Sequence, residues 1–390
     1  MKRRIGIIVL AVLTLGVIAF FIFVPGVVEN SVNKVAPGDD KVSAHAEALQ
    51  KTLDVADMHA DSLLWKRDLL KRSDRGQVDL PRLQAGHYAL QVFSSVTKAP
   101  RNQNYDGNSG DTDKVTALVV ADMQPVRTWN SLLERSLYHA EKLKAFAARS
   151  DGQMRVITTP AELQKLAADR RAGRPVVGAM LSIEGLQDLE GRLDNLDRLY
   201  AAGFRMAGLA HFFDNDVSGS MHGIKKGGLT PLGRQAVARM EKLGMLVDVA
   251  HASHETVAEL IAIARRPLVS SHGGVQATCK VNRNLTDAEI RGVARTGGVI
   301  GIGYWDGAVC STKPADVAKA ITHVRDLVGI DHVGLGSDFD GAVTTQFDAS
   351  QVILVTQALI DAGFSDDDIR KVMGGNVLRV LTAGMAPGHP

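Results

Sequence analysis

The chain has 390 residues, of which 45% are hydrophobic and 23% are charged, and this balance is typical of a globular protein. Its formal net charge of +2 and the lack of a basic stretch with interleaved aromatic residues give no reason to expect a nucleic-acid partner. Two cysteines, Cys279 and Cys310, are too few for a disulfide-rich scaffold. They either pair in an oxidising compartment or remain as two buried free thiols.

The amino terminus has the pattern of a membrane anchor. Residues 1–4 read MKRR, and residues 5–24 contain no charged side chain. About 20 apolar residues cross a bilayer as a helix, and positive residues before them favour a cytoplasmic amino terminus. We therefore expect an anchor over residues 1–25, a tether over 26–44 and an extracytoplasmic, periplasmic domain over 45–390. The alternative is a cleaved signal peptide that leaves a secreted or periplasmic protein, but the apolar run exceeds the usual length of about 7–15 residues.

Eight apolar, strand-like runs follow the tether, and amphipathic helical patterns lie between them. Such an alternation predicts a parallel sheet covered by helices. The helical patterns span 161–172, 193–202, 230–243, 255–265, 287–296 and 314–328. The strand-like runs span 53–59, 87–94, 175–184, 204–213, 244–251, 266–272, 298–304 and 332–338.

Eight strands with intervening helices predict one α/β domain, a (β/α)8 TIM barrel. The long gap between the second and third strands, about residues 97–174, is expected to be an insertion. A doubly wound open sheet is the alternative, although no GxGxxG motif follows the first strand.

Histidine or carboxylate side chains follow most of these strands. In an α/β barrel the carboxyl ends of the strands form the active-site face, so these side chains are expected to converge there. Four imidazoles and three carboxylates exceed the usual three protein ligands of one catalytic zinc, and two metal ions would use the surplus. Ligands of nitrogen and oxygen without thiolate suit zinc. The residues are His59, Asp61, Glu184, His211, His251, His272 and Asp338.

The same motifs, in the order HxD, SIEG, AH, VDxAH, SxH and GSDFDG, resemble the membrane dipeptidase (renal dipeptidase) family, peptidase family M19, a group of metal-dependent hydrolases of the amidohydrolase type. The likeness covers about residues 53–381 and includes VDLPRLQAG, GLTPLG, NRNL and GGNVLRVL. The resemblance implies a hydrolase, a metalloprotease of the dipeptidase kind with two zinc ions per chain. It also implies a dipeptide substrate, tolerance of a D-residue at the carboxyl-terminal position, and a homodimer.

The resemblance also implies roles for individual residues. His59 and Asp61 would bind the first zinc, Glu184 would bridge the two ions, and His251 and His272 would bind the second. The remaining roles concern substrate and chemistry: His211 would contact the substrate and its tetrahedral intermediate, Arg283 in the NRN motif would hold the substrate carboxylate, and Asp338 would be the acid/base. The positions of Cys279 and Cys310 resemble those of a disulfide in the secreted mammalian members.

The expected chemistry is attack of a metal-bridging hydroxide on the scissile carbonyl, because metal binding lowers the pKa of water towards about 7. Asp338 would accept the hydroxide proton and pass it to the leaving amine, and His211 would donate a hydrogen bond to the carbonyl oxygen. The alternative is another binuclear amidohydrolase acting on a cyclic or acylated amide, which would not need Arg283 to hold a free carboxylate. A non-catalytic, anchored binding protein is disfavoured because every expected ligand is present.

Overall fold

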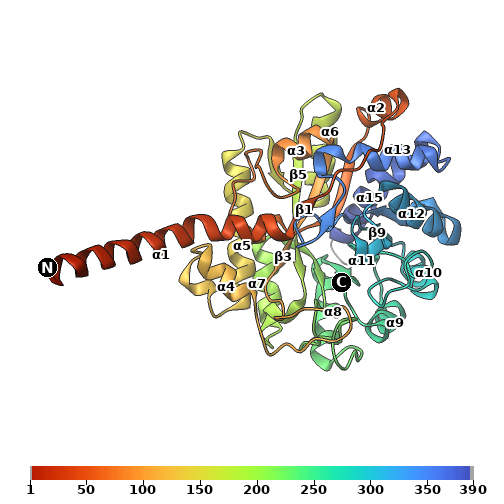
Figure 1. The fold of residues 1–390 in the computed structure, drawn as a ribbon. Helices are drawn as coiled ribbons and strands as arrows, with labels where there is room; N and C mark the ends of the chain where they lie inside the picture. The colour runs from red at the N-terminus through yellow and green to blue at the C-terminus, as the bar shows by residue number, and fades with distance from the viewer. Residues whose placement is uncertain (1, 387–390) are drawn as a thin grey trace.

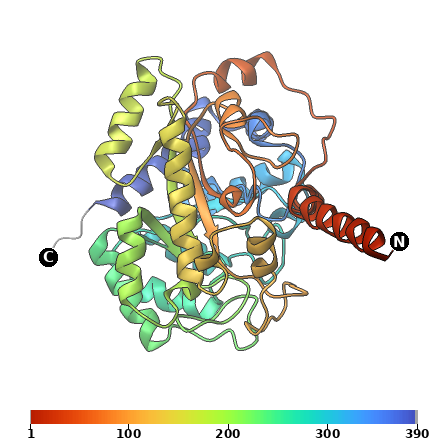
Figure 2. The same cartoon turned by 90° about the vertical axis from the view of Figure 1, so that its left-hand side faces the viewer.

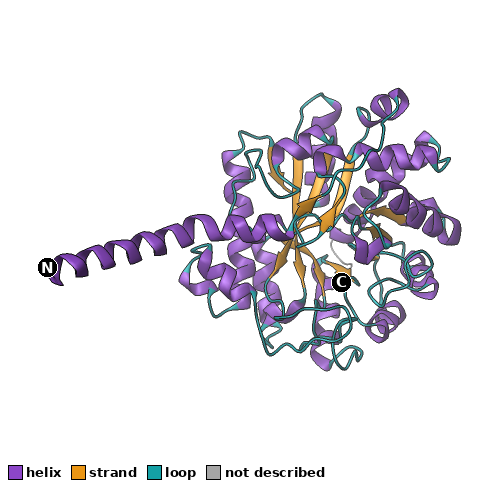
Figure 3. Ribbon diagram, viewed as in Figure 1, coloured by secondary structure: helices purple, strands orange, loops and turns teal. Residues whose placement is uncertain are grey.

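The computed structural model describes residues 2–386, with side chains from residue 4 onward. Met1 and residues 387–390, the last part of the expected domain 45–390, lie outside the described residues. Strands occupy the centre of the body and helices surround them (Figure 3).

Eight parallel strands close into a ring, which confirms the predicted (β/α)8 barrel. The ring closes where β3 pairs directly with β5, from Leu90 opposite Gly178 to Val96 opposite Glu184. Each predicted strand run contains one strand of the ring or most of it. In order around the ring the strands are β2 (Val55–Ala60), β3 (Tyr88–Val96), β5 (Val177–Glu184), β6 (Phe204–Gly208), β7 (Leu246–Asp248), β8 (Leu268–Ser270), β9 (Val299–Ile302) and β10 (Val333–Leu335).

The helices around the ring begin and end at residues with clear local signals. Thr159 and Glu162 form a reciprocal capping box at the start of α6, which satisfies backbone N–H groups that have no partner inside the helix. Gly244, with a φ of 75°, ends α8 in the left-handed conformation that glycine adopts without strain. The outer helices are α6 (Pro160–Arg171), α7 (Asp194–Ala202), α8 (Pro231–Leu243), α9 (His254–Ile263), α10 (Asp287–Arg295), α12 (Pro314–Val328) and α13 (Ile353–Asp361).

One apolar cluster fills the barrel interior. Strands around the ring contribute to it, for example through Met58, Met180 and Met206, together with α15 (Asn376–Met385). Asn376 at the start of α15 donates a hydrogen bond to the carbonyl of Val333, the first residue of β10, at 2.8 Å, so α15 lies at the amino-terminal end of the barrel. The opposite rim, at the carboxyl ends of the strands, is left for polar side chains.

The excursion between β3 and β5 contains α4 (Val115–Ala121), α5 (Leu132–Arg149), β4 (Met154–Val156) and α6. Strand β4 adds to the edge of β5 outside the ring and lies beyond the eight predicted strands. Shorter helices lie in the segments between these elements: α2 (Ala44–Gln50), α3 (Leu80–Ala85), α11 (Asp306–Val309) and α14 (Asp366–Arg370).

Helix α1 (Lys2–Val32) projects from the body as one long helix (Figures 1 and 2). Its residues 4–32 are long and apolar enough to cross a membrane, with a mean hydropathy of 3.2 in the most apolar window. The helix continues through Pro25 to Val32, and β1 (Lys34–Val35) then pairs with β11 (Thr344–Thr345) beside the barrel.

A disulfide joins Cys279 and Cys310, whose Cα atoms lie 5.4 Å apart. It links the segment after β8 to the segment after β9, two neighbouring positions on the ring. Arg283 lies four residues after Cys279 in the loop that follows β8.

Candidate metal centre and active site

The structure brings all seven strand-end residues to one rim of the barrel, where each is buried. His59 and Asp61 come from the end of β2, and Glu184 is the last residue of β5. The loops after β6, β7, β8 and β10 supply His211, His251, His272 and Asp338.

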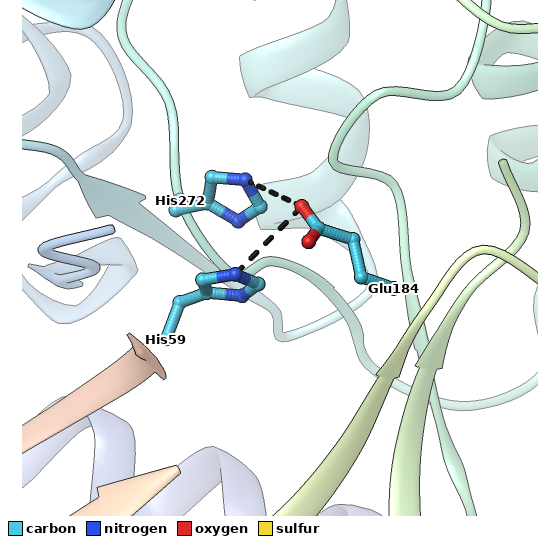
Figure 4. Close-up of side chains that lie close together, drawn as sticks. All are labelled: His59, Glu184 and His272. Atoms are coloured by element: carbon cyan, nitrogen blue, oxygen red, sulfur yellow. Dashed lines mark ion pairs between the residues drawn. The ribbon is translucent and has the colours of Figure 1, made fainter. Parts of the chain in front are cut away.

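Glu184 lies at the centre of this cluster. Its Oε1 atom is 2.9 Å from His251 Nε2, 3.3 Å from His272 Nε2 and 3.5 Å from His211 Nε2. His59 Nε2 is 3.7 Å from the same oxygen, and Figure 4 shows the His59 and His272 rings both directed at one oxygen of Glu184. One carboxylate therefore contacts four imidazoles.

Three groups of these side chains have the spacing of metal ligands. They are His59, Glu184 and His272; Glu184, His211 and His251; and His59, Asp61 and Asp338, each with ligand atoms within 4.8 Å of one another. Glu184 and His59 each belong to two groups. These two shared residues connect the three groups into one continuous cluster of ligand-type side chains.

Charges in the cluster are poorly balanced without a cation. Burial, reinforced by the neighbouring Asp61, raises the pKa of Glu184 well above its ordinary value. Burial likewise raises the pKa of Asp338 to about 8, against the opposing effect of His59. Burial lowers the pKa of His59, but the charges of Glu184, Asp61 and Asp338 outweigh it and raise that pKa to about 10.

The other three imidazoles are held neutral. Burial lowers the pKa of His211 to about 3 and brings the pKa values of His251 and His272 well below their ordinary range. Neutral imidazole is the form that binds metal. A divalent cation bound here would favour the ionised form of the carboxyl groups and would replace the protons that their raised pKa values retain.

Unpaired polar atoms also fit a metal. Among the described residues, His59 Nε2, Asp61 Oδ1 and Glu184 Oε2 are buried and have no hydrogen-bond partner. An unsatisfied buried polar group costs about 1–3 kcal/mol, and native proteins rarely leave several together. The donor set of imidazole nitrogen and carboxylate oxygen, with no thiolate, is the one that zinc accepts.

Residues behind the cluster orient it, and sequence analysis missed them. Asp57 Oδ1 accepts hydrogen bonds from the backbone N–H groups of His59 (2.8 Å) and Ser337 (3.2 Å), which ties the ends of β2 and β10 together. The Ser271 hydroxyl lies 2.8 Å from His272 Nδ1. For Asp57 a signal existed, because it precedes His59 and Asp61 at the same two-residue spacing in DMHAD.

Backbone conformation turns two of the strand-end residues towards the site. His251 has a φ of 62° and Asp338 a φ of 59°, in the left-handed region that residues other than glycine seldom adopt. Such conformations cost about 1–3 kcal/mol and are concentrated at functional sites. The local strain at these two positions therefore supports a functional arrangement over a merely structural one.

Arg283 lies beside the cluster in the loop after β8 and is buried. Its Nη2 donates to the backbone carbonyl of His272 at 3.1 Å, and its guanidinium carbon is 5.5 Å from the centre of the Trp305 ring. It lines the same cavity, of about 450 Å³, as Asp61, Glu184 and Asp338. Carboxylate and histidine side chains and one guanidinium therefore line the same cavity.

The ring of strands and the cluster at its carboxyl ends define a (β/α)8 metallohydrolase. Residues 43–386 match the family described as Membrane dipeptidase (Peptidase family M19). The chain belongs to this family and is a metallodipeptidase.

Named relatives agree with this assignment. The chain is 31% identical over 363 residues to Dipeptidase aclJ of Aspergillus oryzae, covering 86% of this chain and 80% of the relative. It is 29% identical over 316 residues to Dipeptidase tcpJ of Claviceps purpurea, covering 78% and 69% of the two chains.

Solved structures share the fold. The probable dipeptidase PvdM from Pseudomonas aeruginosa has a TM-score of 0.72 at 23% identity, covering 87% of this chain and 98% of that one. A metallopeptidase from Rhodobacter sphaeroides, solved with a phosphinate mimic of the dipeptide L-Ala-D-Ala, has a TM-score of 0.66 at 23% identity, covering 85% and 99% of the two chains.

Proposed function

We propose that the chain is a zinc-dependent dipeptidase with two zinc ions per chain, which accepts a D-residue at the carboxyl-terminal position of its substrate. The observation that carries the proposal is the contact of one Glu184 oxygen with four imidazoles, because a carboxylate in that position can bridge two cations. In this assignment His59 and Asp61 hold one zinc, and His251 and His272 hold the other. When bound, the metal supplies a water of lowered pKa as the nucleophile and polarises the scissile carbonyl.

Arg283 is assigned to the substrate carboxylate. A guanidinium can bind a terminal carboxylate through two parallel hydrogen bonds, and that contact distinguishes a dipeptide from a cyclic or acylated amide. Its place in the cavity wall next to the metal-binding residues supports this role. A dipeptide held there would place its single peptide bond over the cluster.

Asp338 is assigned to proton transfer. Its Oδ1 atom is 3.9 Å from His59 Nε2, so the carboxyl group borders the cluster, and it also lines the cavity. Burial raises its pKa to about 8, and a carboxyl group with a pKa near neutrality can both accept a proton and deliver it to a leaving amine.

His211 is assigned to the substrate and its tetrahedral intermediate. Its Nδ1 lies 3.4 Å from the Lys98 carbonyl oxygen, and the tautomer of the neutral ring decides which nitrogen carries the proton. With the proton on Nε2, the ring can donate a hydrogen bond to the carbonyl oxygen of the substrate. With the proton on Nδ1, Nε2 instead offers a lone pair to a cation.

Two further parts of the proposal rest on other observations. The Rhodobacter sphaeroides structure with a mimic of L-Ala-D-Ala supports tolerance of a D-residue in this family fold. The long apolar helix α1 after the basic residues of the amino terminus supports a single membrane span with an extracytoplasmic, periplasmic domain.

One experiment tests the catalytic assignment. The full-length protein, purified in detergent micelles, is assayed with L-Ala-L-Ala and with L-Ala-D-Ala before chelation, after chelation and after zinc is restored. Cleavage of both substrates that is lost on chelation and regained with about two zinc ions per chain supports the proposal. Recovery with one ion overturns the binuclear centre, and cleavage of L-Ala-L-Ala alone overturns the D-residue assignment.

A further inference from the structure

The end of the membrane-type helix α1 is fixed against the barrel rim. Glu29 is 1% exposed, and its carboxylate oxygens lie 2.5 Å from Arg67 Nε and 2.9 Å from Arg75 Nε. Arg67 in turn forms an ion pair with Asp340, which follows Asp338 by two residues. The last turns of α1 are therefore connected through two buried side chains to the loop that carries the acid/base candidate.

Further contacts hold the segment after Glu29. The Asn33 side-chain oxygen accepts a hydrogen bond from the Ala342 backbone N–H at 2.8 Å. The Lys34 carbonyl accepts another from the Gln77 side chain at 3.0 Å, and β1 pairs with β11. A segment held by two side chains and a strand pairing occupies one position relative to the barrel.

This position puts α1 into the wall of the active-site cavity. Val28 and Val32, one helical turn apart, line the same cavity as Glu184 and Asp338. Val32 also packs against the apolar cluster that forms this part of the cavity wall, which includes Trp65. The same aliphatic side of the wall continues at the ends of β2 and β3 and in α4, with Leu64, Val96, Ala99, Val115 and Leu118, and aromatic residues line the cavity elsewhere, among them Tyr105, Phe212 and Trp305.

The aliphatic side of the wall and Arg283 lie on opposite sides of the barrel mouth. In the ring order β2, β3, β5, β6, β7, β8, β9, β10, strand β8 is four places from β3. Arg283 follows β8, whereas the apolar wall surrounds the ends of β2 and β3. A substrate that places its carboxylate at Arg283 and its peptide bond over Glu184 thus directs its amino-terminal residue at the apolar wall.

From this arrangement we propose that Val28 and Val32 of α1 form part of the subsite for the amino-terminal side chain, and that they select dipeptides with a large apolar residue at that position. The inference rests on the proposed dipeptidase function and on the assignment of Arg283. Burial of apolar area supplies about 25 cal/mol per Å², so a leucine side chain gains more from this wall than an alanine does. The anchor helix is then part of the specificity pocket as well as a membrane segment.

The test uses the full-length protein in detergent micelles and compares kcat/KM for L-Leu-L-Ala and L-Ala-L-Ala. The double variant Val28→Thr, Val32→Thr keeps β-branched side chains but places two hydroxyl groups in the wall. We expect the Leu/Ala ratio of kcat/KM to fall about tenfold. This is about the discrimination that one methylene group provides in an apolar pocket. Val27→Thr is the matched control, because Val27 is 66% exposed and is not among the cavity-lining residues.

A second variant tests the same wall by size. Val28→Phe narrows the subsite, so the ratio should fall again, this time because the larger side chain is excluded. If wild type, Val28→Phe and the double Thr variant all show the same Leu/Ala ratio of kcat/KM, this inference is overturned and the dipeptidase proposal still stands. A zinc-loaded, folded wild-type protein that cleaves neither dipeptide overturns both.

Discussion

The Nε2 atoms of His251 and His272 lie 2.9 Å apart, and both are within 3.3 Å of Glu184 Oε1. Two imidazoles and a carboxylate at such distances need either shared protons or a shared cation. Burial holds both imidazoles neutral, the form in which each can offer a lone pair to a cation. These three side chains would together hold a cation, and because Glu184 also faces His59 and His211 it is assigned as the central ligand.

Glu184→Gln should weaken metal binding more than any other single substitution in the cluster, because an amide cannot offset cationic charge and one Glu184 oxygen faces all four imidazoles. We expect metal affinity to fall by about two orders of magnitude or more, beyond the 10–100-fold typical of residues behind the ligands. Metal content after dialysis measures this. Glu47→Gln, an exposed substitution in α2, is the control, and full metal content in Glu184→Gln would refute the central role.

Asp338→Asn should separate proton transfer from metal binding. The amide keeps the shape of the side chain but cannot carry the proton, so kcat should fall by about 10²–10⁴ while metal content stays near that of the wild type. Parallel measurements of turnover and metal content decide the role. Loss of metal from Asp338→Asn would show that Asp338 is a metal ligand, as its proximity to His59 and Asp61 allows. Unchanged turnover would show that Asp338 does not transfer the proton. The exposed Asp367→Asn serves as the control.

The barrel could be predicted from sequence because the ring strands are apolar runs, and polar residues follow most of them. The ligand-type side chains of β2, β5, β6, β7, β8 and β10 are therefore recognisable at the strand ends. Strand β4, residues Met154–Val156, has no such pattern: it is three residues long and exists through its pairing with β5. Short strands of this kind depend on tertiary context more than on their own residues.

The docking of α1 could not be predicted from sequence for a related reason. Pro25 and Gly26 favour a break in a helix, and a lone glutamate after an apolar segment has no signature of burial. Glu29 is buried only because Arg67 and Arg75, some forty residues later in the chain, meet it at the rim. The role of Val28 in the cavity wall follows from those two ion pairs.

Arg283→Lys tests the carboxylate contact. Lysine keeps the charge but loses the planar pair of donors, so kcat/KM for L-Ala-L-Ala should fall about 10–100-fold, mainly through KM. The carboxamide of the same dipeptide lacks the carboxylate, and its cleavage should change little between wild type and variant. Arg291→Lys, an exposed substitution on α10, is the control. Equal losses for acid and amide would point to a structural role for Arg283 and would favour an amide substrate without a free carboxylate.

Asp188 offers a test of pH-dependent stability away from the metal-binding residues. It is fully buried, and its Oδ2 accepts a hydrogen bond from the Ser136 hydroxyl at 2.7 Å. Burial raises its pKa to about 7, against about 3.9 in an unfolded chain. The folded state therefore holds this proton more tightly, so its contribution to stability is complete below pH of about 4 and is lost as the pH rises towards 7.

At about 1.4 kcal/mol per pKa unit, this loss is on the order of 4 kcal/mol. Asp188→Asn cannot ionise, so its Tm relative to wild type should rise by several degrees between pH 5 and pH 8. Thermal unfolding of the full-length protein in detergent at both pH values measures the difference, and effects of other titrating groups cancel because both proteins share them. Asp326→Asn, on the exposed side of α12, should show no such rise. A constant Tm difference for Asp188→Asn would mean that Asp188 is already ionised in the folded protein at pH 5.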